Sequence, residues 1–285
     1  MPVVITYITT ALQAEARPLI DHYRLKQDTE SHALRVYRSR DVILVVGGVG
    51  KIKSAIATSV LLSAHSERCG IFALNIGIAG AFDDGSGPSC EIGDFFLVNK
   101  LVDQSSGRAF FPDLLAKVSC RETLLTTVER PLDRREGITI DRGLVDMEGT
   151  GFFQAAATFV GPHQVAVLKI VSDFLEVGRF DKNWVSDLVS ARLNEIDEIR
   201  DAHAVLLGED YDSLGSSEHE LLDRIRGNLR LTFTQYKILT EQARAYKLAT
   251  NNPLPDLASF LSLTVTNKND RKQHLDRICE KFLPT

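Results

Sequence analysis

Hydrophobic residues follow two different patterns along the chain. In roughly the first two thirds, short β-branched runs alternate with segments whose apolar residues recur at helical spacing. Beyond about residue 181 the pattern is helical throughout, and strand signals are few. The chain is therefore predicted to contain an α/β domain over residues 1–185 and an all-helical extension over residues 186–285, whose role the sequence leaves open.

The first region contains predicted strands separated by helices and glycine-rich turns. The strands are expected at 3–8, 34–37, 42–46, 71–76, 95–101 and 165–171. The helices are expected at 11–23, after Gly50 and at 148–159. This order predicts a three-layer αβα sandwich, in which a mixed but mostly parallel central sheet is covered by helices on both faces. Such sheets bind their ligands at the carboxyl ends of the strands.

The second region carries helix-capping signals and a local excess of positive charge. Thr232 with Gln235 has the pattern of a capping box, and Asn269 or Asp270 is expected to cap the last helix. Residues 224–247 include six basic residues and one acidic residue. A solvated helix face accounts for this excess, and an anionic partner is the alternative.

The composition is that of an ordinary globular chain, with 44% hydrophobic and 25% charged residues. No apolar run approaches the roughly 20 residues that a membrane-spanning helix requires. The first residues have a strand pattern without a basic leader, so we expect no signal peptide and a cytoplasmic protein. The formal net charge of −5 opposes binding to a polyanion and disfavours nucleic acid as a partner.

Cysteine and histidine are not spaced as metal ligands. The four cysteines form no CxxC pair, and the seven histidines form no HxxxH or HExxH motif. We therefore predict no metal site, no cofactor and no disulfide framework, with the cysteines reduced.

Two glycine-rich segments follow predicted strands. Gly-Gly-Val-Gly-Lys at 47–51 joins a strand to a helix, and Asn-Ile-Gly-Ile-Ala-Gly at 75–80 is predicted to be a second turn. Backbone N–H groups at such turns approach ligands closely, although a purely structural turn is the more common reason for either segment alone. Two turns at neighbouring strand ends predict a binding crevice.

Three acidic residues are predicted to lie at the same edge of the sheet. Glu15 is one turn into the first helix, Glu148 opens a later helix, and Asp173 ends the last strand. Any one of them is explained by helix capping or surface charge. Three carboxylates around one crevice suit general acid and base catalysis on a bond whose cleavage builds an oxocarbenium-like cation.

Several of these segments together resemble the nucleoside phosphorylase and nucleosidase superfamily, most closely the methylthioadenosine/S-adenosylhomocysteine nucleosidases. The motifs are Ala-Leu-Gln-Ala-Glu at 11–15, Gly-Val-Gly-Lys at 48–51, the segment 75–80, Ile-Gly-Asp at 92–94, Met-Glu-Gly at 147–149 and Val-Ser-Asp at 171–173. The resemblance covers about residues 3–184 and implies a phosphorylase/hydrolase-like fold. It also implies a small purine nucleoside as the substrate and a homodimer.

The resemblance assigns a role to each acidic residue. Glu15 would activate the attacking water, and Glu148 would accept the ribose 2'-hydroxyl beside Met147, which would pack on the sugar. Asp173, steadied by Ser172, would protonate or hydrogen-bond purine N7. The positions expected to line the pocket for the 5' substituent are Leu12, Val49 and Phe180. Further substrate-binding positions fall on Ile78, Ala79, Gly80 and Lys169.

Two departures from the superfamily pattern bear on the reaction. Ile78 replaces a serine and has no hydroxyl for water or phosphate, and Lys169 replaces an arginine and loses its bidentate geometry. Both changes weaken a phosphate site, so the sequence favours hydrolysis of a purine nucleoside. The alternatives are a phosphate-dependent purine nucleoside phosphorylase, a futalosine-type hydrolase, and a nucleoside-binding module that has lost turnover.

Overall fold

The computed structural model of the chain divides into two compact units, Met1–Gly208 and Glu209–Thr285. Each unit has its own hydrophobic core. The structure describes residues 4–29, 34–63, 70–82, 90–136, 140, 143–176, 181–211, 214–250, 252–263, 265 and 267–282.

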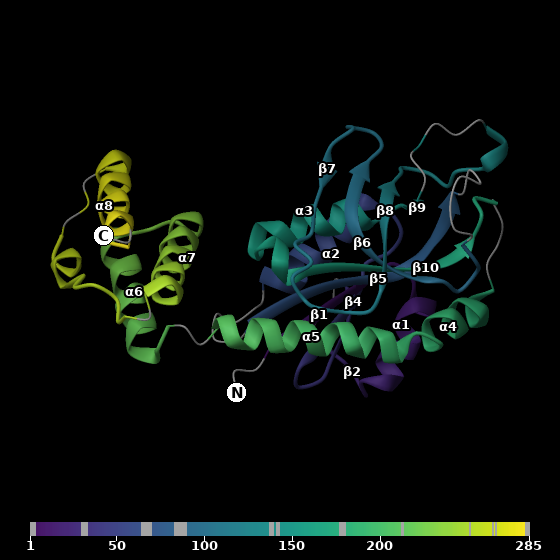
Figure 1. The fold of residues 1–285 in the computed structure, drawn as a ribbon, viewed down its shortest axis with the longest axis horizontal. Helices are drawn as coiled ribbons and strands as arrows, with labels where there is room; N and C mark the ends of the chain where they lie inside the picture. Colours follow the sequence, from purple (N-terminus) through teal and green to yellow (C-terminus); the bar gives the residue numbers. More distant parts are fainter. Residues whose placement is uncertain are drawn as a thin grey trace. The chain divides into compact units, whose positions relative to one another are not determined.

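The first unit is built on one mixed sheet, in the order β10-β6-β8-β9-β5-β1-β4-β3-β2 with β7 beside β6 (Figure 1). The strands are β1 Val4–Thr10, β2 Lys26–Gln27, β3 Arg35–Arg38, β4 Val42–Val46, β5 Gly70–Phe82, β6 Phe95–Asp103, β7 Ala109–Phe110, β8 Arg121–Thr127, β9 Gly143–Asp146 and β10 Val165–Asp173. The four strands β2, β7, β8 and β9 were not predicted from the sequence.

Part of this sheet closes on itself, which the predicted sandwich did not anticipate. Strand β10 pairs with both β5 and β6, and β8 and β9 complete a ring that returns to β5. Among the ten described pairings, five are parallel and five antiparallel, so the predicted excess of parallel pairs is not observed. The α/β class and the mixed sheet are confirmed, whereas the open three-layer description is corrected by this ring.

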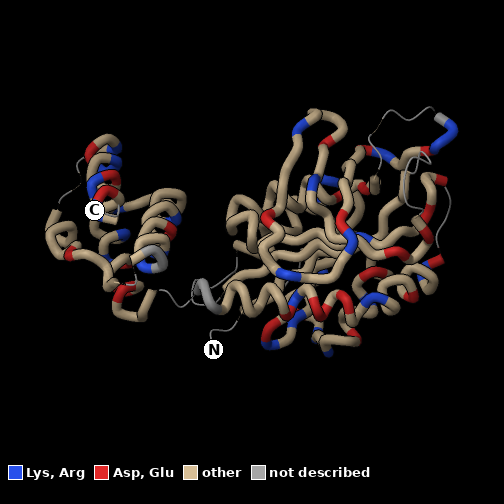
Figure 2. The backbone as a smooth tube through the Cα atoms, viewed as in Figure 1, with Lys and Arg blue, Asp and Glu red and all other residues tan. Residues whose placement is uncertain are grey.

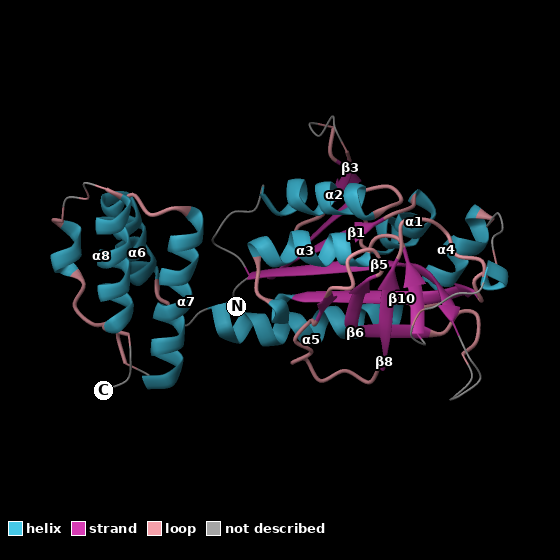
Figure 3. Cartoon of the chain, turned by 90° about the horizontal axis from the view of Figure 1, so that it is seen from above, coloured by secondary structure: helices cyan, strands magenta, loops and turns pink. Residues whose placement is uncertain are grey.

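Helices cover both faces of the sheet. They are α1 Gln13–His22, α2 Lys51–Ser63, α3 Gly149–Phe159, α4 Lys182–Ser190 and α5 Leu193–Tyr211, with 3-10 turns η1 Arg134–Glu136 and η2 Pro162–Gln164. On β10, Val165 and Val167 pack in one core cluster with α2 and α3, while Ala166 and Leu168 pack in the other with α1, α4 and α5. Figure 3 shows α2 and α3 on one side of β5 and β10 and α5 on the other. This alternation follows from the period of two along a strand.

The predicted turn at 75–80 is wrong, because β5 continues as a strand through this segment. A Cβ on Gly77 would lie 2.9 Å from Glu15 Oε1 and 3.4 Å from Lys169 Nζ. A Cβ on Gly80 would lie 3.1 Å from Asp173 Oδ1. These glycines therefore allow charged side chains to approach the strand closely, and no reversal of the chain is involved.

Helix α5 belongs to the first unit as far as Gly208, so this unit extends past the expected boundary at residue 185. Ile196, Ile199 and Leu207 are buried in the same cluster as β1 and β10. His203 stacks on Phe72 of β5 with ring centroids 4.2 Å apart. The apolar stripe that predicted a helical extension therefore covers the sheet instead of starting a new unit.

The second unit consists of α6 Ser216–Leu229, α7 Phe233–Thr250, η3 Ala258–Leu261 and α8 Lys268–Glu280. The predicted capping box is confirmed, since Gln235 Oε1 accepts the N–H of Thr232 and the Thr232 hydroxyl accepts the N–H of Gln235. Asn267 caps α8, two residues before the expected Asn269.

Charged residues of both signs are interspersed on the second unit, as seen along α8 in Figure 2. Lys247 pairs with Glu218 at 2.6 Å, and Arg226 lies over the ring of Tyr236. Part of the positive charge noted in the sequence is thus already neutralised or packed. No helix in the described part of the chain is long and apolar enough to cross a membrane.

The assignment of α5 to the first unit is testable by truncating its buried face. Ile199 is 1% exposed, and Val205 on the same helix is 64% exposed. We expect Ile199→Ala to lower the free energy of unfolding by about 2–5 kcal/mol, and Val205→Ala to change it by less than about 0.5 kcal/mol. Denaturant titration followed by the fluorescence of Trp184, the single tryptophan, reports on this unit. Equal effects of the two variants would contradict the assignment.

Candidate active site

The carboxylate of Glu15 is buried and held by main-chain donors. Its Oε2 accepts the N–H groups of Ala11 at 3.0 Å and Leu12 at 2.8 Å, and its Oε1 accepts the N–H of Ile78 at 3.0 Å. Burial raises the pKa of Glu15, while these hydrogen bonds and the charge of Lys169 act in the opposite direction. The side chain therefore has a fixed position from which it can accept a proton.

A buried ion pair lies beside this carboxylate. Lys169 Nζ is 2.9 Å from Asp146 Oδ2, and the two residues are 1% and 6% exposed. Asp146 also accepts the hydroxyl of Thr127 at 2.7 Å and the N–H of Gly149 at 2.8 Å. Burial alone would lower the pKa of Lys169, but the charges of Asp146 and two neighbouring glutamates raise it, so the amine stays protonated.

Glu148 reaches across to the glycine turn. It stands at the N-cap position of α3, yet the first amides of that helix donate to Asp146 and Thr127. The Glu148 side chain instead accepts the N–H of Gly50 at 2.7 Å. Burial, and then the charge of Asp146, raise the pKa of Glu148 to about 7.

The predicted turn at 47–51 is confirmed and is anchored by its lysine. Gly48 and Gly50 have φ of 91° and 110°, a region that favours glycine. Lys51 Nζ lies 2.8 Å from Asp103 Oδ2 and 2.6 Å from Glu129 Oε1. These two ion pairs tie the start of α2 to the ends of β6 and β8 and so hold Gly50 against Glu148.

Asp173 sits at the end of β10 with Ser172 as its neighbour. The Ser172 hydroxyl is 2.7 Å from Asp173 Oδ2 and 3.2 Å from the carbonyl oxygen of Ala79. A hydroxyl carries one proton. It can therefore donate to ionised Asp173, or donate to Ala79 and accept from protonated Asp173, so this pair accommodates both protonation states.

Strand β5 brings the predicted site residues to one edge of the ring. Glu15 is held at Ile78, and Asp173 is paired with Gly80, two residues and roughly 7 Å further along the strand. Lys169 lies on the same side of β5 as Glu15, because a Cβ on Gly77 would lie 3.4 Å from Lys169 Nζ and 2.9 Å from Glu15 Oε1. Glu148 follows β9, in which Val145 is paired with Gly80. The three predicted acids thus lie around the second half of β5.

The remaining residues that were predicted to bind the substrate lie in different environments. Leu12 and Ile78 each donate a main-chain N–H to Glu15. Met147 is half-buried beside Glu148, and Val49 is 43% exposed beside Gly50. Phe180 lies outside the described residues.

The sequence analysis missed Asp146, although a signal for it was present. Asp146 follows an apolar pair at the end of one strand, and Lys169 interrupts the apolar run of another. A charged residue inside an apolar strand requires a partner of opposite charge when it is buried. Asp146 and Lys169 carry opposite charges next to apolar residues of two different strands, so the sequence predicts an ion pair between these strands.

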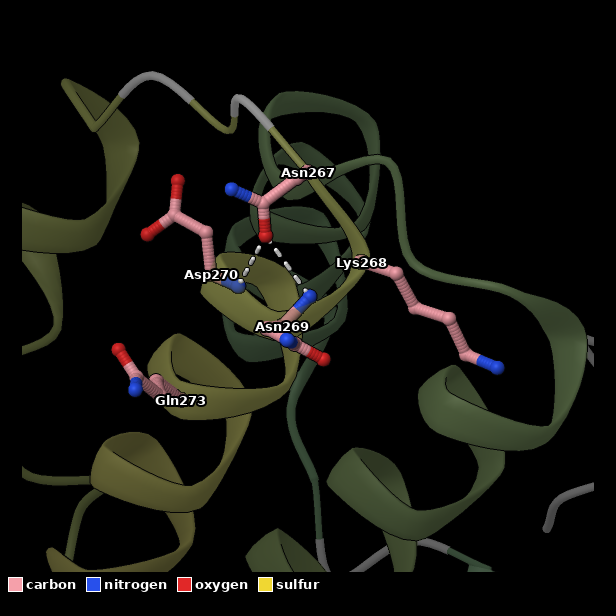
Figure 4. Close-up of a pocket in the computed structure, with 5 residues that line it drawn as sticks. All are labelled: Asn267, Lys268, Asn269, Asp270 and Gln273. Atoms are coloured by element: carbon pink, nitrogen blue, oxygen red, sulfur yellow. Dashed lines mark hydrogen bonds between the residues drawn. The ribbon is translucent and has the colours of Figure 1, made fainter.

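The second unit has a surface hollow at the start of α8, lined by Asn267, Lys268, Asn269, Asp270 and Gln273 (Figure 4). Asn267 Oδ1 accepts the N–H groups of Asn269 and Asp270, so this hollow is a capped helix start. None of the predicted site residues belongs to it. Within the described ranges, no group of three or more His, Cys, Asp or Glu side chains is placed to hold a metal ion.

Known proteins of similar sequence are nucleosidases. A 5'-methylthioadenosine/S-adenosylhomocysteine nucleosidase of Marinomonas sp. (strain MWYL1) is 28% identical over 122 residues, which are 40% of this chain and 48% of that protein. An aminodeoxyfutalosine nucleosidase of Campylobacter jejuni is 25% identical over 127 residues, which are 43% of this chain and 52% of that protein. The chain thus spans about half the length of the curated relatives it matches. No family model matches the chain.

Solved structures of similar fold are also nucleosidases. The apo structure of 5'-methylthioadenosine nucleosidase from Arabidopsis thaliana superposes with a TM-score of 0.58 at 20% identity, covering 71% of this chain and 97% of that one. This likeness establishes the fold of the first unit's sheet and helices. The resemblance drawn from the sequence motifs is confirmed by the names of the two relatives, and the structural neighbour agrees with the expected fold.

The buried setting of Glu148 predicts a pH-dependent cost in stability. Since its folded pKa is about 7 and its ordinary value 4.5, the folded chain binds more protons than the unfolded chain between these pH values, and stability falls as the pH rises. Glu148→Gln keeps an acceptor for Gly50 without this cost. We expect its free energy of unfolding, relative to wild type, to be higher at pH 8 than at pH 5 by on the order of 1–3 kcal/mol. A difference that does not vary with pH in denaturant titrations would contradict the shift.

Proposed function

We propose that the chain hydrolyses the N-glycosidic bond of a purine nucleoside of the methylthioadenosine or S-adenosylhomocysteine class and releases the free base. The observation that carries this proposal is the buried Glu15 carboxylate, fixed by three main-chain N–H groups next to Lys169 and Glu148. A phosphorylase-like fold is supported by the likeness to the Arabidopsis nucleosidase. The names of both curated relatives point to the same bond.

Glu15 is the group that activates water in this proposal. Its Oε1 accepts one hydrogen bond from Ile78 and retains a second lone pair for a water molecule. As the proton passes to Glu15, the water oxygen bonds to C1' of the ribose and the bond from C1' to purine N9 breaks. The carboxylates of Glu15 and Glu148 stabilise the positive charge that develops on the sugar.

Glu148 orients the sugar. As a carboxylate held by Gly50, it accepts the ribose 2'-hydroxyl, and Met147 packs against the ring. Leu12 lies three residues before Glu15 and Val49 lies directly before Gly50, and both contact the 5' substituent in this proposal. Phe180 is assigned to the same pocket by the sequence resemblance alone.

Asp173 assists departure of the base. It donates a proton to purine N7, so that the electron pair of the broken bond remains on a neutral base, a step that contributes about 10²- to 10⁴-fold in general acid catalysis. The contact with Ser172 supports this role because the serine hydroxyl satisfies Asp173 before and after the transfer. Ala79 and Gly80 belong to the neighbouring strand β5 and lie beside Asp173.

Water is favoured over phosphate as the nucleophile. Lys169 is 1% exposed and paired with Asp146, so its charge is not presented to an incoming anion. Ile78 offers its N–H to Glu15 and has no hydroxyl. A futalosine-type hydrolase is the second candidate, because one relative is named an aminodeoxyfutalosine nucleosidase.

The proposed enzyme acts as a homodimer in the cytoplasm. Helix α2 exposes an apolar stripe at helical spacing, in which Ile52 is 75% exposed, Ile56 54% and Val60 45%. The stripe starts next to the glycine turn, and a second copy of the chain would bury it.

The direct test is incubation with methylthioadenosine, S-adenosylhomocysteine, aminodeoxyfutalosine and inosine, each with and without phosphate. We expect free purine and free sugar from at least one of the first three without phosphate. A sugar 1-phosphate formed only in phosphate buffer would identify a phosphorylase. Intact nucleosides in every sample, with binding seen by calorimetry, would leave only a binding module.

Glu15→Gln tests the assignment of the base. The amide keeps the size of the side chain but cannot take a proton, so we expect hydrolysis to fall by at least about 10²-fold. Nucleoside binding by calorimetry is expected to survive, because contacts to the sugar and base come from other residues. Turnover near the wild-type rate would show that water is activated elsewhere.

The dimer is tested by placing charge on the α2 stripe. We expect wild type to sediment as a dimer and Ile52→Glu combined with Ile56→Glu to sediment as a monomer, because buried carboxylates without partners oppose association. Val205→Glu, on the exposed face of α5, is the control and should leave the dimer intact. A monomeric wild type at micromolar concentration would contradict the proposal.

A further inference from the structure

One buried ammonium group lies among several carboxylates of the candidate site. Lys169 stands between Leu168 and Ile170 in an apolar strand and is 1% exposed. Its Nζ contacts Asp146 Oδ2 at 2.9 Å. Taking a lysine out of water to this extent is unfavourable unless its charge is compensated. The compensation comes from the acids of the site, which links the amine to their charge state.

The position of Gly77 shows how close Lys169 is to Glu15. A Cβ at Gly77 would lie 2.9 Å from Glu15 Oε1 and 3.4 Å from Lys169 Nζ. These distances to a common point limit the separation of the two charged atoms to about 6 Å, within the range over which opposite charges favour ionisation. Because residue 77 is glycine, it places no side chain of its own next to these two groups.

Glu148 belongs to the same group of charges. The charged groups that act on it are Asp146 on β9, Lys169 on β10 and Glu15 on α1, and the N–H of Gly50 binds its oxygen. Asp146 and Glu15 disfavour ionisation of Glu148, while Lys169 and Gly50 favour it. The balance of these contacts sets the charge of the residue that would hold the ribose.

We propose that Lys169 is a positioning residue for the hydrolysis proposed above: it is the internal counter-ion that favours the ionised forms of Glu15 and Glu148 against the effect of their burial, and Asp146 fixes its location. This inference rests on the proposed function. It reassigns Lys169, since a side chain that serves carboxylates inside the protein is not a ligand for phosphate or substrate.

The chemistry of lysine suits this role. An ammonium group is a compact charge with three donors on a flexible stem, whereas a guanidinium is a rigid planar fork with five donors. One proton of Lys169 points to Asp146, and the others remain for neighbouring acids. A compact ammonium group at this buried position therefore fits a cation shared among several carboxylates.

The test compares the pH dependence of kcat/KM in two variants, one of which removes a positive charge and the other a negative charge. In Lys169→Met, loss of the positive charge should raise the midpoint of the acidic limb by about 1–3 pH units, because Glu148 and Glu15 become harder to ionise. In Asp146→Asn, loss of a negative charge should lower the midpoint. Lys272→Met, an exposed lysine of the second unit, is the matched control and should leave the profile unchanged.

A purely structural lysine would give a different result. It would reduce the amount of active enzyme and leave the midpoint in place, which would overturn the inference. Lys169→Arg should restore a midpoint near that of wild type, because it retains the charge. If Lys169→Met does not fold, Asp146→Asn decides: a midpoint unchanged from wild type would again overturn the inference.

A second readout separates this inference from the proposed function. In protein carrying ¹³C-labelled glutamate carboxyls, the resonance of Glu148 is assigned by its loss in Glu148→Gln, and its titration is followed by NMR without substrate. The same opposite shifts are expected in Lys169→Met and Asp146→Asn. A wild type that cleaves no nucleoside would overturn the proposed function while this titration still tests Lys169. An active wild type whose Glu148 titration is insensitive to Lys169→Met would overturn the inference alone.

Discussion

The buried carboxylate of Asp146 is the contact on which the arrangement of the site depends. It joins four elements, because it ends β9, accepts the Thr127 hydroxyl from β8 and the first amide of α3, and pairs with Lys169 from β10. Breaking a buried ion pair by removing one partner costs about 3–5 kcal/mol, because the other charge is left uncompensated. Since Asp146 satisfies the start of α3, the neighbouring Glu148 is available to reach the glycine turn.

The ring of five strands explains how distant segments meet. β5 is long enough to pair with β1 in its first half and with β9 at its end, while β10 runs beside its middle. Glu15 enters from the helix after β1, and Asp173 enters from the end of β10. An open sheet would spread these strand ends along one edge, whereas the ring gathers them around β5.

Local patterns predicted much of the first unit, and contacts between distant residues explain the rest. The strand at Val42–Val46 and the start of α3 follow from apolar periodicity and were predicted closely. Strand β9 was not predicted, because its four residues, Gly-Leu-Val-Asp, contain only one apolar pair and no alternation of apolar and polar residues. The glycines at 77 and 80 resembled a turn, and only the approach of Glu15 and Asp173 shows why they belong to a strand. The burial of Asp146 could not be predicted from its own segment, because its partner Lys169 lies on another strand.

The three main-chain donors around Glu15 determine which chemical changes can reach its hydrogen bonds. They are the N–H groups of residues 11, 12 and 78, so a change of side chain at any of these positions leaves a donor in place. Ile78 holds the carboxylate in this way although its side chain has no hydroxyl. Alanine substitution at the three positions would therefore not remove these hydrogen bonds. Amide-to-ester exchange in the backbone, by semisynthesis, is the chemical change that removes them.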